Sequence, residues 1–162
     1  MTELADRSLK TFLRKSTIAY ANSATSEEEI DPGLYCGHFS YEDFDITDLY
    51  RVSPDSRTYI GVEEVAHGNV PVWRAAYTGS IMANVEPEIV DDILGFYKRA
   101  LKKPAQELPI RGPRTISIGE YKYTLSSTRG PLKVARFAIA EEITHRGSRV
   151  YIGDVSGGRI DQ

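Results

Sequence analysis

The sequence contains very little cysteine, no long apolar run and no excess of basic residues. Its single cysteine, Cys36, excludes a disulfide within the chain and favours a reducing compartment. No apolar run approaches the roughly 20 residues that a membrane-spanning helix needs. The first twenty residues alternate charged and apolar side chains, which is unlike a signal peptide. We therefore expect a cytoplasmic protein with no membrane partner.

The charge balance excludes a general affinity for polyanions. Twenty Lys and Arg against 23 Asp and Glu give a net charge of −3, and the sequence shows no local basic patch that would attract a phosphate backbone. We expect no direct nucleic-acid partner. The 162 residues, 41% of them hydrophobic and 27% charged, are enough for the core of one soluble domain.

The chain resembles itself. Residues 62–79 read VEEVAHGNVPVWRAAYTG and residues 140–157 read AEEITHRGSRVYIGDVSG, and five of these 18 positions are identical at a separation of 78 residues. Chance predicts about one identity in such an alignment. Upstream, Gly37-x-Phe39-x-Tyr41 matches Gly119-x-Tyr121-x-Tyr123. We interpret residues 1–83 and 84–162 as two copies of one unit within a single domain; coincidence, helped by strand-like composition, is the alternative.

Each copy is predicted to be one helix followed by three strands. Apolar residues at helical spacing predict a helix from Glu86 that ends before Pro104, and a weaker pattern runs through Leu9, Phe12 and Leu13. Residues rich in β-branched and aromatic side chains predict strands at 34–41, 57–66, 70–78, 115–124, 133–144 and 148–155. This pattern indicates an α+β fold, a tandem helix-β-β-β duplication forming a mainly antiparallel sheet with two packed helices.

Turn and loop residues complete the prediction. His67-Gly68-Asn69 and Arg146-Gly147-Ser148 are typical of hairpin turns between the last two strands of each copy. The acidic segments 26–31 and 42–48 are expected to be solvated loops, of which the second, with interleaved apolar residues, is a candidate lid.

Two glutamates occupy the apolar face of equivalent strands. Alternate residues of a strand share a face, which places Glu141 in a row with Phe137, Ile139 and Ile143, and Glu63 in the matching row with Tyr59. Burying an unpaired carboxylate costs several kcal/mol. Two such residues at equivalent positions therefore indicate that the interior requires a carboxylate there.

Three interpretations of these glutamates remain open. Each could be paired with an arginine or with backbone donors where the two copies meet. They could instead line a cavity with aromatic rings and hold a cationic ligand by charge and cation–π attraction. Ten tyrosines against five phenylalanines fit a partly wet lining. Lastly, the pair could act as acid and base in catalysis.

The segment Pro109-Ile110-Arg111-Gly112-Pro113 has no counterpart in the first copy. Such a stiff loop could present the Arg111 guanidinium to a carboxylate or phosphate of a ligand. It could equally be a rigid connector in which Arg111 pairs with one of the glutamates. The histidines at the two hairpins, His67 and His145, have no third ligand at useful spacing, so we expect no metal site.

Several short motifs run through the chain: Gly61-x-Glu63, Pro71-Val72-Trp73, Tyr77-x-Gly79, Arg111-Gly112-Pro113, Gly119-Glu120-Tyr121-x-Tyr123, Glu141-x-Ile143 and Gly157-Gly158. Together they resemble the signature of an uncharacterised bacterial domain-of-unknown-function family, from about Phe12 to Ile160. In that family the domain occurs alone or behind an XRE-type helix-turn-helix segment, which implies an effector-sensing role. This chain starts with the first helix of the domain, so we expect no DNA-binding segment. The architecture is also loosely similar to GyrI-like effector-binding domains, which surround a groove with a central glutamate.

We expect non-catalytic binding of a small organic molecule, amine-bearing or polar-aromatic, without a cofactor. The candidate ligand-binding residues are Glu63, Glu141, Trp73, Tyr41, Tyr59, Tyr77, Tyr123, Phe137, Tyr151 and Arg111. A protein-interaction or dimerisation module, in which exposed aromatic residues join a partner chain or form a homodimer, is the alternative. A hydrolase or lyase that uses the paired carboxylates is the third possibility.

Overall fold

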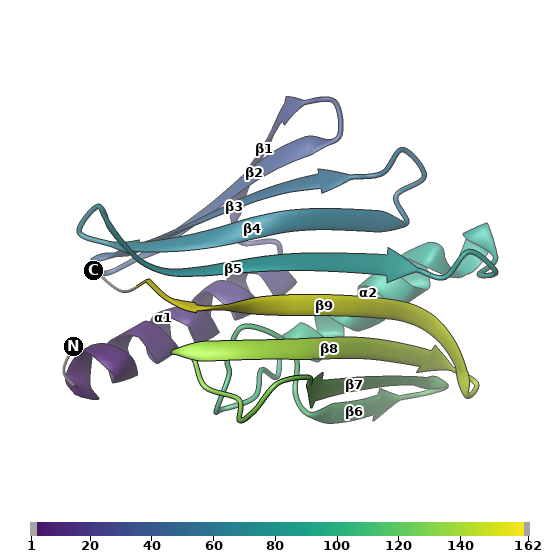
Figure 1. Cartoon of the computed structure of the whole chain (residues 1–162). Coiled ribbons are helices and arrows are strands. Elements are labelled where there is room, and N and C mark those ends of the chain that lie inside the picture. Colours follow the sequence, from purple (N-terminus) through teal and green to yellow (C-terminus); the bar gives the residue numbers. More distant parts are fainter. Residues whose placement is uncertain (1–2, 161–162) are drawn as a thin grey trace.

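A computed structural model describes residues 3–160 and consists of a nine-stranded sheet with two helices on the same face (Figure 1). Helix α1 spans Glu3–Ala21, the short 3-10 helix η1 Pro87–Ile89 and helix α2 Val90–Leu101. The strands are β1 Ser26–Asp31, β2 Leu34–Tyr41, β3 Phe44–Val52, β4 Thr58–His67, β5 Val70–Ile81, β6 Thr115–Ile118, β7 Tyr121–Ser127, β8 Arg136–His145 and β9 Ser148–Arg159. This confirms the α+β class, the antiparallel sheet and the two packed helices.

The sheet is assembled from two runs of hairpin-connected strands that meet at its centre. Its order is β1-β2-β3-β4-β5-β9-β8-β7-β6, and each neighbouring pair is antiparallel. Strands β5 and β9 form the central pair, in register from Trp73 opposite Arg159 to Ile81 opposite Tyr151. Strands β1 and β6 are the two edges (Figure 1). The ends of the two expected copies, residues 1–2 and 161–162, lie outside the described residues.

The two predicted hairpin turns are confirmed. Gly68 and Asn69 connect β4 to β5 with φ values of 54° and 68°, and Arg146 and Gly147 connect β8 to β9 with 52° and 81°. Two central residues with positive φ match the twist of the flanking strands, which is why such turns favour glycine and asparagine. Each hairpin also has a register shift two or three residues before its turn, at Val65/Ala66 and at Ile143/Thr144.

The predicted number of strands is wrong. Five strands follow α1 and four follow α2, instead of three each. The acidic segment expected to be a loop is the edge strand β1, all of whose residues are exposed, and most of the candidate lid belongs to β3. The predicted strand at 115–124 is the hairpin β6–β7, with Gly119 at a φ of 61° in its turn. The sequence analysis missed β1 and β3 because both segments are rich in acidic residues, which are uncommon in strands.

Both helices bury one apolar face against the sheet. In α2 the buried residues recur at helical spacing: Ile93, Phe96, Tyr97, Ala100 and Leu101. In α1 the largest buried side chains are Leu9, Phe12 and Leu13, and the Phe12 ring stacks on Phe44 of β3 at 5.3 Å. Neither helix described within residues 3–160 is long and apolar enough to cross a bilayer.

Candidate functional site

A row of carboxylates crosses the helix-covered face of the sheet. Glu27 of β1 lies opposite Gly37 of β2, Gly37 lies opposite Asp48 of β3, and Asp48 lies opposite Glu63 of β4. Neighbouring strands are about 4.8 Å apart, so the three acidic side chains are close enough to influence one another. Gly37 is buried and provides no side chain between Glu27 and Asp48, which leaves space above the sheet at that point.

Asp48 faces the interior because β3 alternates. Phe44, Ile46, Tyr50 and Val52 share its face, and they are buried or partly buried, whereas the intervening residues are exposed. The sequence analysis did not select Asp48 because the acidic residues around it indicated a loop. The period of two from Phe44 to Val52 was the pattern that could have identified it.

A cavity of about 260 Å³ lies between this row and the two helices. Asp48, Glu63 and Glu27 line it from the sheet, and residues of α1, α2 and the segment before β6 line its other sides, notably Thr17, Tyr20, Tyr97, Lys98, Ile110 and Arg111. Five tyrosines contribute to the lining: Tyr20, Tyr50, Tyr59, Tyr77 and Tyr97. The lining therefore combines aromatic rings with several carboxylates.

Gly61 leaves room for two tyrosine side chains beside the carboxylate row. A Cβ atom at Gly61 would lie 2.6 Å from both the Cβ of Tyr50 and the Oη of Tyr77, its partners on the neighbouring strands. No side chain fits in that position while the rings stay in place. Gly61 is thus required for Tyr50 and Tyr77 to reach the carboxylate row.

Tyrosine hydroxyls hold two of the carboxylates. Tyr77 donates a hydrogen bond of 2.7 Å to Asp48, and Tyr50 donates one of 2.6 Å to Glu27. Burial, followed by the negative charge of Glu63, raises the pKa of the Asp48 carboxyl to about 7. A carboxylate accepts about four hydrogen bonds, so Asp48 keeps acceptor capacity directed at the cavity.

Arg111 lies between the two predicted glutamates and pairs with both. Its Nη1 donates to Glu63 Oε1 at 3.1 Å and to the carbonyl oxygen of Ile110 at 2.6 Å, while its Nε lies 3.8 Å from Glu141 Oε2. The guanidinium also lies 5.1 Å from the centre of the Tyr77 ring. The expectation that this loop pairs its arginine with a glutamate is confirmed.

Glu141 belongs to a buried polar cluster behind the cavity. The residue is 3% exposed and accepts hydrogen bonds from Tyr123 at 2.6 Å and from Tyr97 at 3.1 Å. Burial raises the pKa of its carboxyl, and the charge of Arg111 opposes that shift. The inward orientation of both glutamates, predicted from strand alternation, is confirmed: Glu63 keeps only 13% of its side chain exposed.

The cavity brings together only part of the predicted residue set. Glu63, Arg111, Tyr59 and Tyr77 line it. The other six residues lie elsewhere, as follows: Glu141, Tyr123 and Tyr151 are in the buried polar cluster, Trp73 and Phe137 stack in the core at 5.8 Å, and Tyr41 lies under the ammonium group of Lys15. Asp48, Glu27, Tyr20, Tyr50 and Tyr97 were not predicted.

The two hairpin histidines, His67 and His145, each pack against an aromatic ring. His67 packs on Phe44 with ring centres 4.6 Å apart, and His145 packs on Tyr121 at 4.4 Å. Among residues 3–160, no group of three or more His, Cys, Asp or Glu is arranged to hold a metal ion.

Comparison with known proteins places the chain in a family without an assigned activity. No curated protein and no solved structure matches it. A family model matches residues 48–160, which include Asp48, Glu63, Arg111 and Glu141, but not Glu27 or α1. More than two thirds of the chain is covered by this match, so the protein belongs to the family described as Domain of unknown function (DUF5680).

Proposed function

We propose that the chain binds a small organic cation, such as a primary amine, in the cavity between the sheet and the two helices. The observation that carries this proposal is the excess of carboxylates over cations in the lining, where Glu27, Asp48 and Glu63 face two cations, Arg111 and Lys98. Arg111 is already engaged with Glu63 and Glu141, and Lys98 lies 5.7 Å from the centre of the Tyr20 ring. Asp48 and Glu27, in contrast, accept hydrogen bonds from tyrosine hydroxyls and have no ion pair within residues 3–160. An ammonium group offers three donors and one positive charge, which suits this end of the cavity.

The aromatic lining supports the same ligand class. A cation within about 6 Å of a tyrosine ring gains about 0.5–2 kcal/mol, and more when it is desolvated. Tyr20, Tyr59 and Tyr97 add ring surface to the two tyrosines that hold the carboxylates. The hydroxyls of Tyr59 and Tyr97 are already bonded to Tyr151 and Glu141. A cavity of about 260 Å³ has the volume of about nine water molecules, so we propose a ligand no larger than a compact amine.

Replacing Asp48 with asparagine is expected to weaken amine binding by about 10- to 100-fold, because a charge-assisted hydrogen bond contributes about 1.5–3 kcal/mol. The measurement is isothermal titration calorimetry with a panel of primary amines at pH 8. The matched control is Asp45→Asn on the same strand, whose carboxylate accepts from Ser40 on the exposed face. Equal affinities of the two variants would contradict the proposal.

The pH dependence gives a second readout of the same carboxyl. A pKa of about 7 means that the Asp48 carboxyl is increasingly protonated below neutrality, and a protonated carboxyl does not attract an ammonium group. Affinity should rise with pH and fall by about tenfold per unit below pH 7, with proton release on binding. In Asp48→Asn this dependence should disappear.

An interaction module is the second candidate function, and the open face of the sheet supports it. Leu49, Ile60 and Val62 are neighbours there, and Ile60 is 58% exposed. Exposed aliphatic patches on a flat sheet favour packing against another sheet. We expect Ile60→Glu to turn a dimer into a monomer in sedimentation velocity, while Ile118→Glu in β6 leaves the dimer intact. A monomeric parent protein would rule this candidate out.

Catalysis by Glu63 and Glu141 as an acid–base pair receives less support. Arg111 is ion-paired with both carboxylates, and Glu141 is not among the residues that line the cavity. An acid and a base need different pKa values and access to one substrate. Pairing with the same arginine favours the charged form of both carboxylates and occupies them, so it works against both conditions.

We also propose that the two halves of the sheet derive from a tandem duplication. The hairpins β4–β5 and β8–β9 agree in length, turn and place of the register shift. Phe44 packs against His67 as Tyr121 packs against His145. This pairing makes β3 the counterpart of β7 and replaces the sequence match between residues 37–41 and 119–123. We further propose a sensing role in a cytoplasmic bacterial protein, either alone or beside an XRE-type segment. The analogy to GyrI-like domains supports the same proposal, because those domains surround a groove with a central glutamate.

A further inference from the structure

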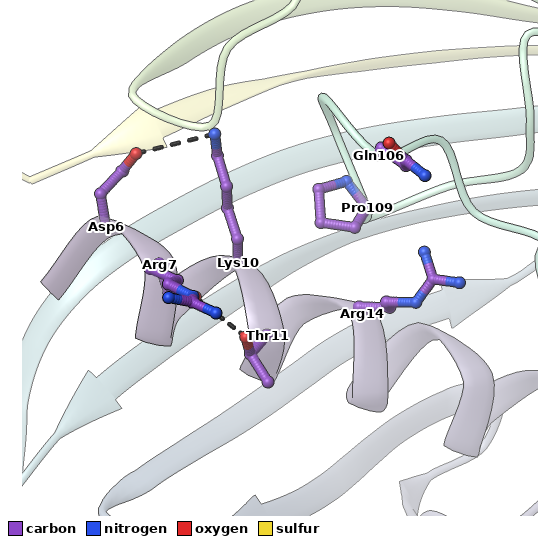
Figure 2. Close-up of a pocket in the computed structure, with 7 residues that line it drawn as sticks. All are labelled: Asp6, Arg7, Lys10, Thr11, Arg14, Gln106 and Pro109. Carbon is purple, nitrogen blue, oxygen red and sulfur yellow. Dashed lines mark hydrogen bonds and ion pairs between the residues drawn. The ribbon is translucent and has the colours of Figure 1, made fainter. Parts of the chain in front are cut away.

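A second hollow lies on the outer side of α1, away from the cavity described above. It has a volume of about 670 Å³ and runs between α1 and the segment that carries Gln106 and Pro109. Three cationic side chains line it: Arg7, Lys10 and Arg14 (Figure 2). We call this hollow the basic groove; the sequence analysis did not identify its three cations as a local basic patch.

The three cations are spread along the groove and do not converge on one point. They lie at positions i, i+3 and i+7 of one helix, so they follow one face over about 10 Å. Figure 2 shows Arg7, Lys10 and Arg14 in succession along α1, with Pro109 and Gln106 on the opposite side. A small anion would need donors that converge, whereas this arrangement suits negative charges repeated along a chain.

The cations of the groove keep free charge. Lys10 lies 3.7 Å from Asp6, which also pairs with Arg159, and Arg14 reaches the carbonyl oxygen of Pro104 at 3.5 Å. Within residues 3–160 the Arg7 guanidinium has no hydrogen bond or ion pair, and its backbone carbonyl accepts from Thr11 (Figure 2). Asp6 is the single acidic residue in the described lining, so the groove carries a net charge of +2.

We propose that the basic groove binds a short acidic peptide segment of a partner protein. Glutamate or aspartate side chains on the same side of an extended peptide recur about every 6.6–6.8 Å. This repeat is longer than the rises of about 4.5 Å and about 6 Å between successive cations of the groove, and the long, flexible Arg and Lys side chains span the difference. The methylene stems of Arg and Lys, together with Pro109, give the peptide backbone an apolar surface. A long nucleic acid fits less well, because the chain as a whole carries −3 and would repel a polyanion beyond the groove.

The test is fluorescence anisotropy with a labelled ten-residue peptide of alternating Glu and Ser at low salt. The parent protein should bind it, and a peptide with Gln in place of Glu should bind at least tenfold more weakly. The variant Arg7→Glu/Lys10→Glu should lose at least tenfold in affinity. Lys102→Glu/Lys103→Glu, which makes the same charge change at exposed residues after α2, should stay within twofold.

Four results would overturn the proposal. These are no peptide binding, equal losses in the two double variants, tighter binding of a single-stranded oligonucleotide of the same charge, and full competition by millimolar inorganic phosphate at unchanged ionic strength. Sedimentation at the assay concentration should show the same association state for the parent protein and for Arg7→Glu/Lys10→Glu, since self-association lost in that variant would mean that a second copy, and not a peptide, occupies the groove.

Discussion

Replacing Arg111 with methionine is expected to lower the free energy of unfolding by about 3–5 kcal/mol. The substitution keeps most of the side-chain volume but leaves Glu141 and Glu63 without their cation. Removing one partner of a buried ion pair costs more than the pair itself contributes, because an uncompensated charge remains inside. Urea unfolding followed by circular dichroism measures the loss.

The control for this prediction is a second substitution in the same cluster. Arg111→Met/Glu141→Gln should recover at least half of the lost free energy, because an amide oxygen still accepts from Tyr97 and Tyr123 and carries no charge. The loss in Arg111→Met should also shrink on acidification, since a carboxyl whose pKa is raised in the folded state destabilises the fold as pH rises. A single variant as stable as the parent protein would show that Arg111 is not needed to neutralise the buried carboxylates.

The second large effect is expected at Gly157 in the central strand pair. A Cβ atom there would lie 2.3 Å from the carbonyl oxygen of Arg74 and 2.7 Å from the Cα of Ala75 on β5. These are backbone atoms that cannot rotate away, so the two strands would have to separate. We expect Gly157→Ala to cost about 3 kcal/mol, which for a chain of this size lowers Tm by about 10 °C.

Gly95→Ala is the matched control, since it adds the same methyl group elsewhere. Gly95 lies in the middle of α2, and the nearest atom to an added Cβ is the end of the Arg99 side chain at 3.9 Å. Alanine should therefore stabilise the helix by about 0.5–1 kcal/mol, and Tm should rise. Differential scanning calorimetry of both variants measures the shifts; shifts of the same sign would contradict the packing described for β9.

The elements with a strong local pattern were predictable. The helix after Pro87 and the two hairpins with their turn residues follow from periodicity and turn chemistry, and the same alternation placed Glu63 and Glu141 inside. Strands β1 and β3 were missed because acidic residues oppose strand propensity there. Pairing with neighbouring strands overrides that local preference. The sequence of one segment alone does not show which strands it will pair with.

The candidate site was predictable only in part, because cavities depend on tertiary packing. Asp48 and Glu63 belong to strands that are adjacent in the sheet, but the register that places them opposite each other is a property of the assembled hairpins. Which aromatic residues line a cavity and which fill the core depends on the positions of α1 and α2 over the sheet. For that reason Tyr20 and Tyr50 line the cavity, whereas Trp73 and Phe137, which were predicted to line it, lie in the core.

The position of Trp73 determines what optical measurements on this protein can report. It is the one tryptophan of the chain, is fully buried, stacks on Phe137 and donates from its indole nitrogen to the carbonyl oxygen of Val134 at 3.1 Å. Its emission should be blue-shifted in the native state and should move to the red only when the core opens. Tryptophan fluorescence is thus a built-in monitor of folding for every variant above, while ligand occupancy has to be followed by heat or by the tyrosine resonances in NMR spectra.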